Sequence, residues 1–85
     1  MIKDCENLTD NYIENMHKLV GANVKRLREE KNISQLKLSQ AMGYKSVSTV
    51  SCGEIYLNNI HFNIEHLAKI AYILDVDICE FFKPI

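Results

Sequence analysis

The stretch from Ser34 to Glu54, SQLKLSQAMGYKSVSTVSCGE, constrains the fold of this chain more than any other. Ser34 can cap a short helix by accepting a hydrogen bond from a free amide of the first turn, and apolar residues follow it at helical spacing. Gly43 stands where that helix must end, because glycine enters the left-handed conformation without steric cost. Ser46 is a second capping residue and opens a run that ends near Gly53. We therefore expect two short helices joined by a tight turn at Gly43.

The composition is that of one small globular domain without cross-links. The chain has 85 residues, of which 47% are apolar, and this suffices for a single core. Its three cysteines are an odd number without CxxC spacing, which predicts reduced thiols in a cytoplasmic protein. No apolar run approaches the roughly 20 residues of a membrane span, and the N-terminus lacks the pattern of a secretory signal. We expect a cytoplasmic protein without a membrane segment.

The net charge of -1 conceals an uneven distribution along the chain. Residues 1–15 sum to -3, residues 16–45 to +5 and residues 46–85 to -3. The positive charge therefore lies beside the two predicted short helices. Such a basic face can hold phosphate groups, although a merely solvated helix face has the same composition.

The segments on either side of the central stretch also have helical patterns. Residues 1–16 are expected to form an N-terminal arm, either frayed or helical, since Thr9 can cap a helix that begins at Asp10. A firm helix follows at roughly 17–31, in which Gly21 marks a junction or a close contact, and Asn32 is a plausible stop.

The second half of the chain begins with a polar connector, Ile55 to Asn63, which turns at the Asn58-Asn59 pair. Asn63 can cap a helix over 64–74, whose wide apolar face implies burial on more than one side. Asp77 can cap a last short helix, which ends before Pro84. The sequence therefore predicts an all-α fold of five helices and no strand, with the main domain over residues 17–85.

Over about residues 19–82, the chain resembles a known family, the lambda/Cro-repressor-like (XRE-type) helix-turn-helix proteins. The resemblance rests on four segments in the family's order: VGANVKRLREEKNIS, SQLKLSQAMG, VSTVSCGE and NIEHLAKIAYILDVDICEFF. It implies a compact lambda-repressor-like domain that acts as a sequence-specific DNA-binding transcriptional regulator of the repressor or controller type. Members of this family bind a palindromic operator in double-stranded DNA as a homodimer, with the second helix of the motif in the major groove.

The resemblance also implies roles for individual residues. Gln35 matches a glutamine that contacts the DNA backbone and supports a base-reading side chain. The positions that face base edges are Val47, Ser48 and Cys52, and those better placed for phosphates are Lys45, Ser46 and Thr49. Asn58, Asn59 and His61 can reach the DNA backbone from the connector, with simple turn formation by the asparagines equally open. The matching core positions are Leu38, Ala41, Val50, Leu67 and Ile70.

Arg28 and Glu54 match an ion pair of the family that ties the first helix to the end of the second helix of the motif. Two solvated charges are the alternative interpretation. We favour the pair, because a buried pair of this kind loses about 3–5 kcal/mol when one partner is removed.

The chain departs from the family pattern at three places. Gly43 to Glu54 spans eleven residues where ten are usual, Gly53 stands where an apolar residue is common, and the connector is about two residues longer. The second helix also carries no arginine for a bidentate contact to guanine, so we expect recognition to depend in part on DNA shape.

Apolar residues near the C-terminus predict a two-fold interface between copies of the chain. Some members of this set should close the core, and the remainder should form the interface, which the N-terminal arm can join. The set comprises Ile73, Ile78, Phe81, Phe82 and Ile85.

Other classes of function have less support in the sequence. A protein-interaction module, such as an antitoxin-like or adaptor subunit, is the main alternative to DNA binding. No nucleophile–base set or phosphate-cradling glycine loop indicates an enzyme. His17, His61 and His66 lack the spacing of metal ligands, so we expect neither a metal nor a cofactor.

Overall fold

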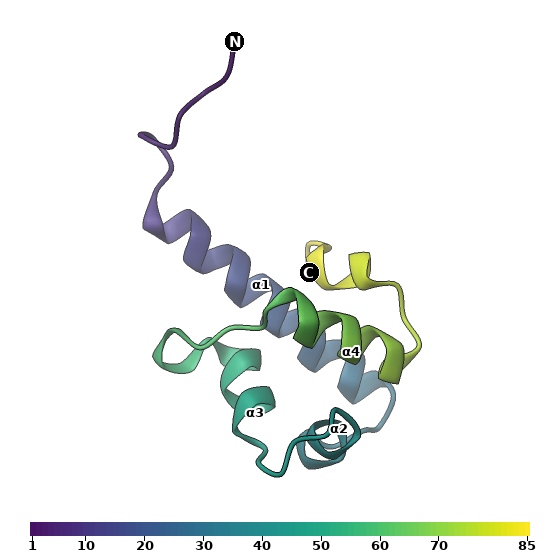
Figure 1. Cartoon of the computed structure of the whole chain (residues 1–85). Coiled ribbons are helices and arrows are strands. Elements are labelled where there is room, and N and C mark those ends of the chain that lie inside the picture. Colours follow the sequence, from purple (N-terminus) through teal and green to yellow (C-terminus); the bar gives the residue numbers. More distant parts are fainter.

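The computed structural model describes residues 1–85 and is helical throughout, without a strand (Figure 1). It contains four α-helices: α1 (Asp10–Glu30), α2 (Gln35–Ala41), α3 (Ser48–Ile55) and α4 (Ile64–Leu74). Two short 3-10 helices follow α3 and α4, at Leu57–Asn59 and Ile78–Phe82. The all-α class is thus confirmed. None of the helices has the length and hydropathy needed to cross a membrane.

The fifth helix of the sequence prediction is a 3-10 helix and not an α-helix. Asp77 begins it as predicted, because its carboxylate accepts a hydrogen bond from the Cys79 amide at 2.8 Å. Only six residues separate Asp77 from Pro84. That interval leaves little room for the i to i+4 hydrogen bonds of an α-helix, and short segments of this kind adopt the tighter 3-10 form.

Helix α1 is longer than the predicted 17–31. It begins at Asp10, where the Thr9 hydroxyl accepts a hydrogen bond from the Tyr12 amide at 3.1 Å, and it ends before Asn32, which has a left-handed φ of 58°. The expected division into an arm of residues 1–16 and a domain of residues 17–85 therefore falls inside one continuous helix. Residues 1–9 precede it without helical structure.

One core holds the helices together. Its largest fully buried side chains are Phe81, Leu38, Ile70 and Leu74, which come from α2, α4 and the C-terminal 3-10 helix. Buried Asn23 of α1 fixes that last segment, because its amide nitrogen donates to the carbonyl oxygens of Phe81 at 2.9 Å and Lys83 at 2.7 Å.

Two predictions about burial are wrong. Ala41 does not belong to the core, because it lies on the exposed side of α2. Helix α4 is not buried on more than one side, since Ile64 is 75% exposed and Ala68 is also exposed. The buried face of α4 is a single stripe at helical spacing: Leu67, Ile70, Ala71 and Leu74.

Two glycines let α1 and α3 pack closely. A Cβ atom on Gly21 would lie 2.4 Å from the carbonyl oxygen of Gly53, so only glycine fits there. A Cβ atom on Gly53 would in turn lie 2.7 Å from the buried ring of Phe62. The predicted close contact at Gly21 is confirmed, and Phe62 occupies the space beside Gly53. Together these contacts fix the position of α3 against α1.

Candidate nucleic-acid interface

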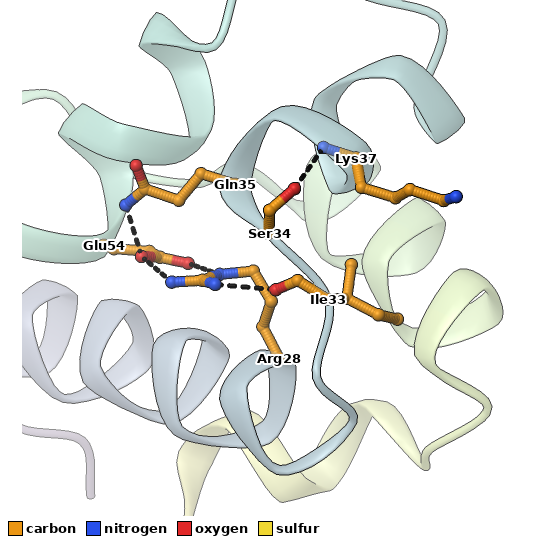
Figure 2. Close-up of polar contacts among 6 residues, drawn as sticks. All are labelled: Arg28, Ile33, Ser34, Gln35, Lys37 and Glu54. Carbon is orange, nitrogen blue, oxygen red and sulfur yellow. Dashed lines mark hydrogen bonds and ion pairs between the residues drawn. The ribbon is translucent and has the colours of Figure 1, made fainter.

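A buried ion pair connects α1 to the end of α3 (Figure 2). Arg28 donates from Nε to Glu54 Oε2 at 2.7 Å and from Nη2 to Glu54 Oε1 at 3.0 Å. The two side chains are 8% and 0% exposed. The hydrogen bond to Glu54 raises the pKa of Arg28 above its ordinary value. Arg28 also donates to the Ile33 carbonyl at 2.7 Å, so it holds the loop that leads into α2.

Gln35 extends this network to the start of α2. Its amide nitrogen donates to Glu54 Oε1 at 2.9 Å, as Figure 2 shows, so the Glu54 carboxylate joins α1, α2 and α3. Ser34 caps α2 as predicted, because its hydroxyl accepts a hydrogen bond from the Lys37 amide at 3.0 Å. The relative placement of α2 and α3 therefore depends on one carboxylate that solvent does not reach.

The turn between α2 and α3 is closed by Gly43 and anchored by Tyr44. Gly43 has a φ of 90°, and the Tyr44 amide donates to the Ser39 carbonyl at 3.0 Å. The Tyr44 ring meets His66 edge-on, with 6.1 Å between ring centroids, and Lys69 Nζ lies 5.3 Å from its centroid. The turn's packing against α4 is thus a feature that the sequence pattern did not reveal.

Helix α3 begins one residue later than predicted and ends two residues later. Its N-cap is Val47 and not Ser46, although the Ser46 hydroxyl still accepts from the Ser48 amide at 3.1 Å and donates to Ser48 Oγ at 2.9 Å. The helix continues past Gly53 to Ile55.

The two sides of α3 differ in chemistry. Val50, Gly53 and Glu54 are buried, and the opposite side presents exposed Ser48 and half-buried Cys52, flanked by half-buried Thr49. Val47 is half-buried and precedes the helix. The outward stripe is therefore made of small side chains, which allow a surface to approach the helix closely.

Sequence reasoning missed Ile55 at the end of this stripe. Ile55 is 58% exposed and continues the spacing of Ser48 and Cys52 by three residues. Helical spacing was the available signal, but the expected end of the helix near Gly53 concealed it.

The segment from Lys31 to Gly53 carries three lysines and no acidic residue. Lys31, Lys37 and Lys45 are exposed, and none has a carboxylate oxygen within 4.0 Å. The next carboxylate along the chain, Glu54, is occupied by Arg28. The positive charge of α2 and the turn is therefore uncompensated. Lys37 was not among the residues predicted to contact DNA, although it stands in the basic run of the sequence.

The connector after α3 turns at the predicted asparagines. Asn58 and Asn59 both adopt left-handed conformations, with φ values of 53° and 63°, and both are exposed. Tyr56, which ends α3, is also left-handed with a φ of 57°. The asparagines thus form the turn, and a contact with a DNA backbone stays a prediction.

The histidines lie in two places. His17 and His61 stack with 3.8 Å between ring centroids, and burial followed by the charge of His61 lowers the pKa of His17. His66 belongs to the N-terminal cap of α4. No three His, Cys, Asp or Glu side chains converge anywhere in the chain.

The predicted dimer residues do not form one surface. Phe81 is wrong as an interface residue, because it is 0% exposed in the core, and Ile78 packs half-buried against that core. Ile73, Phe82 and Ile85 line three separate hollows. Of these three, Phe82 is 45% and Ile85 73% exposed.

Comparison with known proteins adds no relative: no protein-family model matches the chain, and no curated protein sequence does.

Proposed function

We propose that this chain is a sequence-specific DNA-binding transcriptional regulator of the repressor or controller type. In this proposal it binds a palindromic operator as a homodimer, with α3 in the major groove. The observation that carries the proposal is the outward stripe of α3, in which the small side chains of Ser48 and Cys52 precede Ile55 and are held in place by the buried Arg28–Glu54–Gln35 network. It stands beside a segment whose three lysines are not neutralised.

The chemistry of the two parts is complementary. Lys31, Lys37 and Lys45 neutralise phosphates and release counterions, which supplies affinity without sequence preference. The hydroxyl groups of Ser48 and Thr49 donate to or accept from base edges. An eight-residue helix such as α3 is about 12 Å long and fits into the major groove. Recognition without an arginine on this stripe also draws on DNA shape.

Selection from a random DNA pool, followed by affinity measurements at two salt concentrations, tests this proposal. We expect an enriched palindromic site with half-sites about 34 Å apart, and a steep loss of affinity as salt rises. A pool without an enriched sequence, together with affinity independent of salt, would overturn it.

The second candidate is a protein-interaction module, and three exposed apolar side chains favour it. Leu36 on α2, Ile55 on α3 and Leu57 after it are 51%, 58% and 48% exposed. Side chains of this kind suit a protein surface better than a phosphate backbone. An unenriched DNA pool would make this the preferred function.

A further inference from the structure

Helix α1 extends well beyond the domain that it helps to build. All of its buried residues lie between Val20 and Arg28, although the helix begins at Asp10. Figure 1 shows its first turns projecting past the other helices, with the N-terminus beyond them. The N-terminal half of α1 therefore has one side that no other part of the chain covers.

The uncovered side continues the stripe that packs into the core. Ile13, Met16 and Val20 follow one another at spacings of three and four residues, which places them on one face of the helix. Val20 is 7% exposed, whereas Met16 is 37%, Ile13 43% and neighbouring Tyr12 57% exposed. An apolar stripe that is buried over one half and exposed over the other indicates an absent partner.

A groove opens beside the point where this stripe enters the domain. Its volume is about 340 Å³, and it is lined mainly by apolar residues, among them Met16 and Val20 on one side and Phe62, Ile64 and Phe82 on the other. Ile64 and Phe82 are 75% and 45% exposed at its rim.

We propose that a second copy of this chain occupies this groove, with the two α1 helices antiparallel and crossing at Met16. In such a pair, position 12 of one helix stands opposite position 20 of the other. The protruding Tyr12 of each copy therefore lies opposite position 20 of the other copy, beside that copy's groove. The groove reaches from Met16 to Val20, so one molecule carries both the projecting Tyr12 and a hollow that can receive it, as a two-fold interface requires.

The charges of α1 agree with this arrangement. Glu14 and Lys18 lie on the opposite side of the helix from Met16 and pair with each other at 3.4 Å. The contacting stripe thus carries no charge that pairing would bury. Tyr12 and Phe82 are 57% and 45% exposed, and they supply the aromatic surface of this contact.

This interface is centred on α1 and retains only Phe82 of the C-terminal set expected from the sequence, and it does not depend on DNA binding. Light scattering of the full chain at tens of micromolar should give twice the 9.8 kDa of one chain. Ile13→Asp should return the mass to that of a monomer. Tyr72→Asp, which changes an 88% exposed residue of α4, is the matched control and should stay dimeric.

Cross-linking at the centre of the helix pair provides a second readout. In a background without the native cysteines, Met16→Cys should form an intermolecular disulfide under mild oxidation, because position 16 faces itself across the two-fold axis. Tyr72→Cys should not. Circular dichroism checks that each variant is helical. A monomeric mass for the unaltered chain, or a dimer that survives Ile13→Asp without a Met16→Cys cross-link, would overturn the interface while leaving DNA binding open.

Discussion

At the scale of single residues, Glu54 has the most structural consequences. Its carboxylate is fully buried and accepts hydrogen bonds from Arg28 and Gln35, so three helices meet at one side chain. Removal of the carboxylate leaves the Arg28 guanidinium buried without a counter-charge, which is far costlier than the loss of an exposed pair.

We expect Glu54→Ala to lower the free energy of unfolding by about 3–5 kcal/mol, as measured by urea denaturation. Glu65→Ala is the matched control, because Glu65 pairs with Lys69 at 3.7 Å on the surface with its side chain 74% exposed. That control should change stability by less than about 1 kcal/mol. Equal effects of the two substitutions would contradict a structural role for the buried pair.

Most capping residues and most core positions were predictable from the sequence: Leu38, Val50, Leu67 and Ile70 are buried as predicted, whereas Ser46 does not cap α3. Thr9, Ser34 and Asn63 cap the helices that follow them, since a cap needs only a side chain and the amides two or three residues ahead. Ala41 and Phe81 were misplaced because their burial depends on which face of a helix meets the rest of the chain. Helical periodicity alone does not give that information.

At the scale of elements, we expect the start of α4 to respond to pH. Asn63 and His66 form a reciprocal cap, in which the Asn63 amide donates to His66 Nδ1 at 3.0 Å. Nδ1 accepts this bond only while it carries no proton. Burial lowers the pKa of His66 below its ordinary value, so the unfolded chain takes up this proton first as the pH falls.

The contribution of this cap to the free energy of unfolding should therefore be fully present above the unfolded pKa of about 6.5. It should be lost as the pH falls through the lowered pKa of His66. His66→Gln keeps a capping amide at the same position but does not titrate, so it should flatten the curve between about pH 7 and pH 5. His17→Gln removes only the separate contribution of His17, whose pKa burial also lowers. An unaltered pH profile in His66→Gln would show that the cap does not sense protonation.

The extent of α3 shows why local patterns give an element more reliably than its ends. The pattern placed the cap of α3 at Ser46, whereas the helix begins at Ser48, after a turn that contacts α4 through Tyr44. Those interactions join residues more than 20 positions apart, and no local pattern contains them. Ser48 and Cys52 of the outward stripe were predictable, but the contacts of Tyr44 with α4 and the place of Ile55 at the end of the stripe became visible only in the folded chain.

At the scale of the whole molecule, the net charge of -1 matters less than its placement. In the proposed complex, Lys45→Gln should make the slope of log affinity against log salt shallower by about one per subunit. Lys83→Gln removes the same charge from the C-terminal segment, which lies on the other side of the molecule from α2 and α3 (Figure 1), and it should leave the slope unchanged. Equal changes in both variants would mean that net charge, and not this face, governs the affinity.

Because α1 is one uninterrupted helix of 21 residues, it works as a rigid lever about 30 Å long. The C-terminal half of α1 is held against α3 by the close contact of Gly21 with Gly53 and by the Arg28–Glu54 ion pair. Its N-terminal half would contact the second molecule. The angle at which two such levers meet would then set both the span and the relative rotation of the two α3 helices. Each residue inserted between Met16 and Val20 would rotate the α1–α1 contact by about 100° relative to α3. The spacing between the two α3 helices of a dimer would therefore depend on the number of residues in α1, far from the surface that faces DNA.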